Sequence, residues 1–392
     1  MIYNFDKVIK RRGTGSIKWD AAELIKKFGI SERFDDESIP LFVADMDFPC
    51  PQPVVDALHR CVDRQIYGYS THLAHPEYFE AIQGWFLRHY SWEINQEHIV
   101  YSPGTVEALY MAIKAFTKPG DGVILQAPVY RPFYGSILDN GRKVINNALI
   151  MENGHYRIDF EDLRLKAADP ANKLFLLCSP HNPVGRVWNR EELSEMAYIC
   201  HKHDVVMVAD EIHGDLIRQN ATFIPLRKVS GHEKIITLTA INKTFNVAGL
   251  HCTNAIIEDE TLRQAFSKES GFKLPSPFAM EALIAAYNEG QDWLDQVKTY
   301  IDGNFDFLKN FLEKRLPEVK FRIPEGTYMG WMDFRDYGLD SKEVHRRIYV
   351  EANVILEDGE MFGEEGAGFQ RICLPTPRSI LEEALERMAK QF

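Results

Sequence analysis

The stretch NREELSEMAYICHKHDVVMVAD, residues 189–210, predicts a helix that leads into a buried strand. Asn189 and Glu192 have the spacing of a capping box, in which two side chains satisfy free backbone N–H groups at a helix start. Apolar residues then recur at helical spacing, at Leu193, Met196, Ala197 and Cys200. The run VVMVAD that follows is short and apolar, as expected of a strand that is covered on both faces.

Strand-like runs of the same kind lie on either side of this unit: GVILQA at 122–127, KLFLLCS at 173–179 and KIITLTAI at 234–241. Strands that alternate with helices pair in parallel through right-handed crossovers, which place helices on both faces of the sheet. The sequence therefore predicts an α/β fold with a mostly parallel central sheet flanked by helices.

The C-terminal part of the chain has a different pattern. Residues 292–316 keep helical periodicity over a long stretch, and residues 319–335 alternate like half-buried strands. These patterns predict a smaller α+β domain beside the large one. The predicted division is an N-terminal segment at 1–45 that joins the small domain, a large domain at 46–290 and a small domain at 291–392.

Composition argues against several classes of partner. The 392 residues carry a formal net charge of −12, whereas nucleic acids and anionic membranes favour basic surfaces. No apolar run approaches the roughly 20 residues that cross a bilayer, and charges interrupt residues 1–16, where a signal peptide needs an apolar stretch. Six cysteines without a C-x-x-C pair predict free thiols in the cytoplasm rather than a disulfide framework or a metal site.

Polar residues follow three of the predicted strands. Asp210 ends one strand, Lys243 follows another, and the loop SPHNPVG at 179–185 leaves a third. Ligands of open α/β sheets bind outside the carboxyl ends of the strands, so we expect these three features to meet at one edge. A lysine that ends an apolar run is more often a surface charge. The neighbouring acid and amide favour a buried amine instead.

This combination suits pyridoxal phosphate, which needs an amine for a Schiff base, a carboxylate at its pyridine nitrogen and a cradle for its phosphate. Gly104 and Thr105 open a predicted helix whose free N–H groups can bind phosphate, although they can equally cap a helix that binds nothing. Tyr130 can stack on a flat ring or can simply pack. Asn182 can donate to a ring oxygen or can only close a rigid turn. His213 can be functional or structural.

The ordered motifs SPHNPVGRVW, VVMVADEIHGDLI and INKTFNVAGL resemble those of the fold-type I pyridoxal phosphate enzymes of the aminotransferase class I/II group. Within that group the chain is similar to the MalY/PatB-type cystathionine β-lyases, also called C–S lyases. That similarity lies in RRGTGSIKWD and VADMDFPCP near the start and in YGYS, IPEGTYMGWMDFR and FGEEGAGFQRI later. The resemblance covers essentially the whole chain.

The resemblance implies roles for individual residues. Lys243 matches the lysine that forms the Schiff base, and Arg371 matches the arginine that binds the substrate α-carboxylate. Tyr69 matches a tyrosine contributed by the other subunit, which implies a homodimer with shared active sites. The other matched positions are Asp210 at the pyridine nitrogen, Asn182 at the phenolic oxygen, Tyr130 on the ring, Gly104 with Thr105 at the phosphate, and His213 where aspartate aminotransferases usually have tyrosine.

Two positions depart from this branch. Asn242 precedes the lysine, where a serine hydroxyl usually meets the phosphate, and its amide can donate there instead. Cys373 follows QRI, where the branch usually has asparagine. These departures leave the preferred substrate open.

The resemblance implies a β-lyase that cleaves L-cystathionine and cysteine-type S-amino acids by α,β-elimination to pyruvate, ammonia and a thiol. An aminotransferase is the alternative, because it shares every step up to loss of the α-proton. A regulatory protein that uses this scaffold to bind a transcription factor is a second alternative. It would be favoured if the cofactor binds and no amino acid is turned over.

Overall fold

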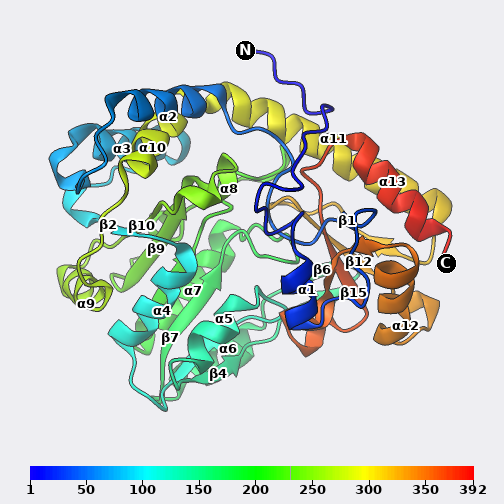
Figure 1. Ribbon diagram of the computed structural model, residues 1–392. Helices are drawn as coiled ribbons and strands as arrows, with labels where there is room; N and C mark the ends of the chain where they lie inside the picture. Colours follow the sequence, from blue (N-terminus) through cyan, green and yellow to red (C-terminus); the bar gives the residue numbers. More distant parts are fainter. Residues whose placement is uncertain (230) are drawn as a thin grey trace.

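A seven-stranded sheet forms the centre of the structure, a computed structural model that describes residues 1–229 and 231–392 (Figure 1). All of its strands run parallel except β10, which is antiparallel to both neighbours. This arrangement confirms the predicted α/β fold with a mostly parallel sheet. In spatial order the strands are β2 (Ile99–Ser102), β10 (Thr253–Ile256), β9 (Ile235–Ala240), β8 (Val206–Asp210), β7 (Asn172–Cys178), β3 (Gly122–Leu125) and β4 (Lys143–Asn146).

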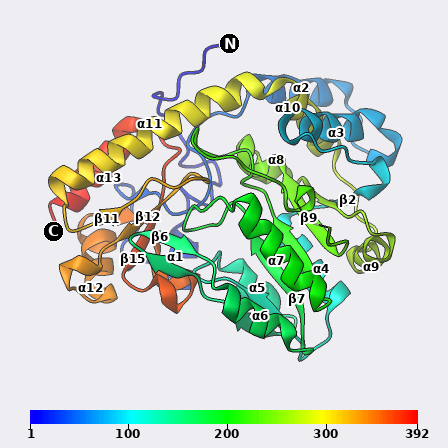
Figure 2. The ribbon, with the colours of Figure 1, turned by 180° about the vertical axis from the view of Figure 1, so that it is seen from behind.

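Helices cover both faces of this sheet because successive residues of a strand point to opposite sides. In β7, Leu174 and Leu176 belong to one core cluster, whereas Phe175 and Leu177 belong to another. Figures 1 and 2 show the two helix layers from opposite sides. The first cluster is covered by α4 (Thr105–Phe116), α5 (Pro132–Leu138) and α9 (Glu260–Ser270), and the second by α6 (Phe160–Ala168) and α7 (Arg190–Lys202).

The predicted helix start at Asn189 is confirmed. The Asn189 side chain accepts the Glu192 N–H at 2.8 Å, and the Glu192 carboxylate accepts the Asn189 N–H at 2.8 Å, which completes the capping box of α7. Lys243 follows a strand, as predicted. Strand β9 ends at Ala240, and Lys243 lies on the short helix α8 (Ile241–Thr244) that comes next, so a helical turn carries the lysine.

A second, four-stranded antiparallel sheet lies beside the central one, in the order β11-β12-β15-β14 (Figure 1). The alternation predicted over 319–335 is only partly right, because residues 329–332 are all buried. Met332 packs in the large core cluster, while Trp331 packs in the cluster on the opposite side. The elements here are β11 (Lys320–Phe321), β12 (Met329–Asp333), β15 (Phe369–Cys373), β14 (Glu357–Asp358), α11 (Gln291–Arg315), α12 (Ser341–His345), a π-helix (Arg346–Glu351) and α13 (Arg378–Ala389).

The N-terminal segment joins the C-terminal part through a strand pair, since β1 (Ile39–Pro40) runs parallel to β13 (Val354–Ile355). The domain boundaries at residues 45 and 290 stay a prediction. No helix among residues 1–229 and 231–392 is long and apolar enough to cross a membrane. The remaining elements are α1 (Ala22–Phe28), α2 (Gln52–Arg64), α3 (Pro76–Tyr90), α10 (Pro277–Glu289) and the hairpin of β5 (Ile150–Glu152) with β6 (His155–Arg157).

Candidate active site

Three parallel strands bring the predicted polar residues to one edge of the central sheet. Asp210 is the last residue of β8 and pairs in register with Cys178, the last residue of β7. Asp210 also pairs with Leu238 of β9, five residues before Lys243. The expected meeting of the acid, the lysine and the 179–185 loop is therefore built by the register of β7, β8 and β9.

Lys243 is turned into the protein. Its Nζ donates a hydrogen bond of 2.8 Å to the carbonyl oxygen of Ala44. Burial lowers the pKa of Lys243, and the negative charge of Asp45 opposes part of this shift. A lowered pKa increases the share of the neutral amine, which is the form that a base or a nucleophile requires. Lys243 is thus half-buried, with its amine bonded within the chain, which favours the functional interpretation over a surface charge.

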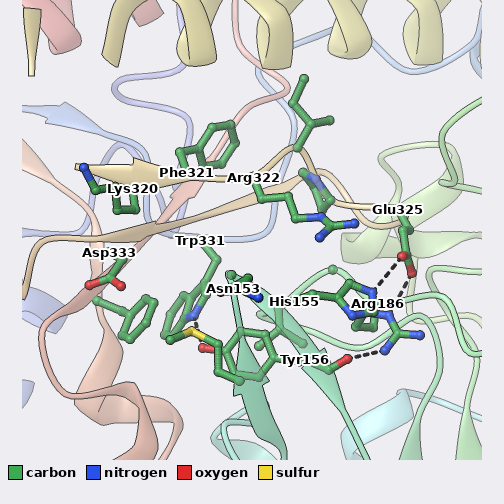
Figure 3. Close-up of a pocket in the computed structure, with 17 residues that line it drawn as sticks. Asn153, His155, Tyr156, Arg186, Lys320, Phe321, Arg322, Glu325, Trp331 and Asp333 are labelled. Atoms are coloured by element: carbon green, nitrogen blue, oxygen red, sulfur yellow. Dashed lines mark hydrogen bonds and ion pairs between the residues drawn. The ribbon is translucent and has the colours of Figure 1, made fainter. Parts of the chain in front are cut away.

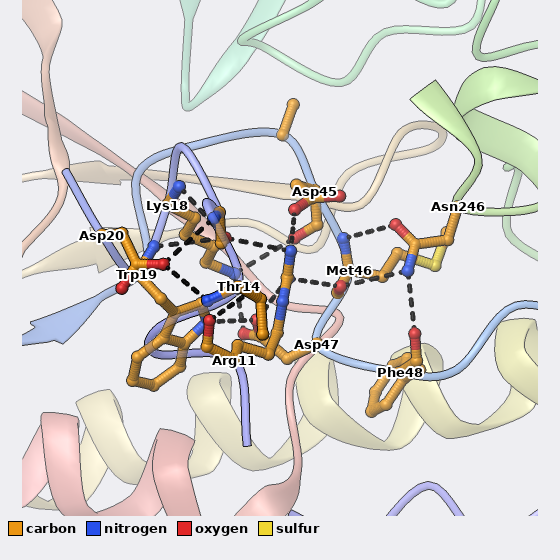
Figure 4. Close-up of polar contacts among 12 residues, drawn as sticks. Arg11, Thr14, Lys18, Trp19, Asp20, Asp45, Met46, Asp47, Phe48 and Asn246 are labelled. Carbon is orange, nitrogen blue, oxygen red and sulfur yellow. Dashed lines mark hydrogen bonds and ion pairs between the residues drawn. The ribbon is translucent and has the colours of Figure 1, made fainter. Parts of the chain in front are cut away.

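A network of charged residues fixes the segment that carries Ala44 (Figure 4). Lys18 is fully buried and donates to an Asp47 oxygen at 2.7 Å, and Arg11 donates to the other at 2.8 Å. From the opposite side, Asn246 accepts the Met46 N–H at 3.0 Å, only three residues beyond Lys243. The N-terminal segment and the lysine-bearing turn are thus held to each other.

Asp210 is a buried carboxylate that lacks a cationic partner among the described residues. It is 4% exposed, and its side chain accepts only a long hydrogen bond of 3.4 Å from the Ile212 N–H. Burial raises the pKa of Asp210 to about 7, and the charge of Lys243 offsets little of this. A bound group with a protonated ring nitrogen would supply the missing positive charge.

Asn182, Tyr130 and Arg371 come together beside Asp210. The backbone N–H of Tyr130 donates to the Asn182 carbonyl at 3.1 Å. The Arg371 Nη1 donates to the Asn182 side-chain oxygen at 3.1 Å, and its Nη2 donates to the Phe42 carbonyl at 2.7 Å. Burial raises the pKa of the Tyr130 phenol to about 12, so this hydroxyl stays protonated. Arg371, from β15 of the second sheet, thus meets Asn182 and Tyr130, which lie in loops at the edge of the central sheet.

Several buried polar atoms around the candidate site have no partner in the described part of the chain. They are His213 Nδ1, Asn242 Oδ1 and Arg371 Nε. Burial lowers the pKa of His213 to about 3, so its imidazole is neutral, and the ring contacts that of Tyr328 edge-on at 5.6 Å between centroids. Unpaired buried polar atoms are costly, so these three atoms are suited to receive a polar ligand.

The predicted phosphate cradle lies at the same edge. Helix α4 begins at Thr105, with Gly104 in extended backbone before it. The Thr105 hydroxyl lies 3.1 Å from that of Thr253, which pairs in register with Ala240, the last residue of β9. The N–H groups of the first helical turn lack partners within the helix and suit an anion.

The structure does not bring Tyr69 to these residues within one chain. Its side chain is fully exposed, with a relative accessibility of 106%. No hydrogen bond or ring contact within the described residues connects it to the site. The segment after α2 that carries Tyr69 lies away from the C-terminal sheet (Figure 1).

Glu357 is a site residue that the sequence did not reveal. It lies on β14 directly opposite Arg371 of β15 and forms an ion pair with the Arg371 Nη2. Nothing in the local sequence distinguishes Glu357 from other acidic residues, because its position depends on the pairing of two strands separated in the chain. Tyr328 was missed for the same reason, although its hydroxyl donates to the Ala44 carbonyl at 3.1 Å.

A separate cavity of about 410 Å³ lies between the β5–β6 hairpin and the loop before β12 (Figure 3). Its polar side is the group of Arg186, Glu325 and His155, in which Arg186 Nε donates to Glu325 at 2.9 Å. Trp331 forms part of its apolar side and donates to the Tyr156 hydroxyl at 3.0 Å. None of the predicted site residues lines it, so the cavity is distinct from the candidate active site.

The chain is similar to known proteins over nearly its whole length. Residues 37–388 match the family model described as aminotransferase class I and II. Over 390 residues the chain is 41% identical to the cystathionine beta-lyase PatB of Bacillus subtilis (strain 168), covering 98% of both proteins.

Two solved structures are similar throughout as well. Cystalysin from Treponema denticola, which contains a pyridoxal 5'-phosphate cofactor, is 37% identical with a TM-score of 0.95, covering 100% of this chain and 99% of that one. The pyridoxal-phosphate-bound C–S lyase from Staphylococcus hominis is 34% identical with a TM-score of 0.93, covering 100% of this chain and 98% of that one.

Proposed function

The chain belongs to the aminotransferase class I and II family, and from this premise we propose that it is a pyridoxal-phosphate-dependent C–S β-lyase. It acts on L-cystathionine and related cysteine-S amino acids by α,β-elimination. The full-length similarity to named C–S lyases carries the reaction type. The half-buried amine of Lys243, the buried acid of Asp210 and the buried guanidinium of Arg371 supply the groups that the reaction needs.

The candidate site fits the cofactor. When bound, pyridoxal phosphate withdraws electrons from the substrate α-carbon. Lys243 would hold the cofactor covalently, and Asp210 would pair with its ring nitrogen. The other contacts fall to Asn182 at the phenolic oxygen, Tyr130 and His213 beside the ring, and Gly104, Thr105 and Asn242 at the phosphate.

Arg371 and Lys243 then have different roles in binding and converting the substrate. Arg371 binds the α-carboxylate, a task that suits a planar guanidinium with several donors. Lys243, whose pKa burial lowers, takes the proton from the α-carbon. The bond from the β-carbon to sulfur breaks, and the electron pair leaves with the thiolate. One water is consumed as the remaining fragment becomes pyruvate and ammonia.

Two chains complete each site in this proposal. Tyr69 belongs to an exposed segment that also presents Ile66, Tyr67 and Leu73. Exposed apolar residues gathered in one segment are typical of an interaction surface. We therefore propose a homodimer in which Tyr69 reaches the site of the partner subunit. The six free cysteines fit a reducing compartment, and we propose the cytoplasm.

An aminotransferase remains the alternative, because the matched family includes such enzymes and the same residues serve both reactions. The two reactions differ in where the electrons go after the α-proton is lost. Elimination expels a thiolate from the β-carbon, whereas transamination returns a proton to the cofactor.

A product assay separates these reactions. L-cystathionine is supplied without any 2-oxo acid, and pyruvate, ammonia and free thiol are followed. L-alanine, which has no leaving group on its β-carbon, is then supplied with a 2-oxo acid, and new amino acid is followed. Pyruvate and thiol should form in the first assay. Turnover only in the second would establish the aminotransferase instead, and bound cofactor with no turnover in either would favour a regulatory protein.

A further inference from the structure

The pairing of β14 with β15 brings the Glu357 carboxylate into contact with Arg371, the arginine proposed to bind the substrate. Glu357 and Arg371 are directly opposite in this antiparallel pair, so their side chains emerge on the same face. Arg371 is 2% exposed, and its Nη2 forms an ion pair with a Glu357 oxygen. The register of the two strands therefore fixes this contact.

The hydrogen bonds of Arg371 show which of its N–H groups the ion pair with Glu357 uses. A guanidinium grips a carboxylate through two parallel N–H groups, taken from Nε with Nη2 or from Nη1 with Nη2. Both arrangements need an N–H group of Nη2. In this structure one Nη2 hydrogen bond goes to the Phe42 carbonyl at 2.7 Å, and the Glu357 carboxylate takes the other. Nε has no partner in the described residues, and Nη1 bonds Asn182.

From this geometry we propose that Glu357 competes with the substrate α-carboxylate for Arg371. The substrate must either displace the Glu357 carboxylate or bind close beside it. The inference rests on the proposed function, in which Arg371 binds that carboxylate. Two carboxylates on one guanidinium repel each other, and the repulsion is strong at a buried site. Glu357 therefore sets the affinity of the site for amino acids.

The surroundings of Glu357 contain two cations besides Arg371. The charges of Arg371, Arg131 and Lys243 all act on this carboxylate, and the phenols of Tyr130 and Tyr349 lie near it. Arg131 is exposed and immediately precedes α5. A Glu357 carboxylate that leaves Arg371 thus still feels the positive charges of Arg131 and Lys243, which lowers the cost of displacement.

The test measures ligand binding rather than turnover. L-alanine binding to the purified protein is measured by calorimetry for the original chain and for Glu357→Gln. Glutamine keeps the size and one acceptor oxygen of glutamate but lacks its charge. The dissociation constant for L-alanine should fall about tenfold or more in Glu357→Gln, because a like-charge contact is removed.

Two controls isolate the carboxylate. Glu360→Gln makes the same charge change at an exposed residue three positions away and should leave L-alanine binding unchanged. L-alanine methyl ester lacks the negative carboxylate, so its affinity should not improve in Glu357→Gln. Thermal unfolding of each variant verifies that the fold is intact.

The outcomes separate this inference from the proposed function. If Glu357→Gln binds L-alanine more weakly or equally well, Glu357 does not compete and the inference is overturned, whether or not the original chain releases thiol from L-cystathionine. If the variant gains affinity for the ester as well, the effect does not come from the carboxylate, and the inference also fails. Tighter binding of L-alanine alone supports it, even if the reaction proves to be transamination.

Discussion

The amine of Lys243 donates a hydrogen bond of 2.8 Å to the carbonyl oxygen of Ala44, 199 residues earlier in the chain. Lys243 lies on the turn after β9, whereas Ala44 belongs to the segment that Arg11 and Lys18 hold in place. The position of the proposed catalytic amine thus depends on the N-terminal segment as well as on the central sheet.

Lys243 should carry the cofactor. The purified protein is expected to be yellow, and borohydride reduction should fix the mass of the cofactor on the peptide that contains Lys243. Lys243→Ala should lose the label and reduce thiol release by at least about 100-fold, because the proton acceptor is lost. A label on any other lysine would refute the assignment. Lys7→Met, a change at an exposed lysine, should keep both the label and the activity.

Asp210→Asn should stabilise the cofactor-free protein while abolishing activity. Burial raises the pKa of Asp210 to about 7, against a usual value near 4. The folded state therefore binds the proton more tightly than the unfolded state, and the free energy of unfolding falls as pH rises between these two values. At pH 8 the carboxylate is charged and buried, so replacing it should raise Tm by a few degrees.

The pH dependence of Tm provides the control for Asp210→Asn. At pH 4 the Asp210 carboxyl is protonated in the folded protein, and Asp210→Asn should change Tm little. Thermal unfolding of both proteins without cofactor, at pH 4, 6 and 8, measures the difference. A constant difference across this range would contradict the proposed burial of an uncompensated charge.

Tyr69 should act across the subunit interface. Tyr69→Phe and Lys243→Ala chains, each inactive alone, are mixed under conditions that allow subunit exchange. A mixed dimer contains one site with both intact residues, so up to half of the sites in mixed dimers regain thiol release. Tyr67→Phe is the matched control on the same exposed segment and should remain active by itself. Absence of recovery after demonstrated exchange would argue against shared sites.

Lys18→Met should destabilise the fold and disturb the active site together. Lys18 is fully buried and paired with Asp47. A buried charge left without a partner costs about 3 kcal/mol, and the loss should be smaller here because Asp47 keeps Arg11 as a partner. Denaturant unfolding measures this loss, with Lys7→Met as the exposed control. Because Lys18 also donates to the Asp45 carbonyl, next to Ala44, thiol release should fall as well. A loss of stability without any effect on activity would show that the N-terminal network does not position Lys243.

The central fold was predictable because its signals are local. The helix from Asn189 and the strand that ends at Asp210 follow from residue spacing within one stretch of about twenty residues. The gathering of Asp210, Lys243 and Asn182 then follows from the rule that ligands meet the carboxyl ends of parallel strands.

The remaining features depend on contacts between distant parts of the chain. Glu357 faces Arg371 only because of the register between β14 and β15, which no local pattern encodes. The short helix α8, which contains Lys243, has only four residues, and this is too few to show a helical period in the sequence. The full burial of residues 329–332 likewise depends on which layers cover each face of β12.

The parallel pairing of β1 with β13 has a consequence for biosynthesis. Residues 39 and 40 are made long before their strand partners at 354 and 355. Domains fold from the N-terminal side as the chain emerges from the ribosome, but β1 cannot pair until β13 has been made. Because Ala44 follows β1 closely, we expect the surroundings of Lys243 to be completed only after residues 354 and 355 have been synthesised.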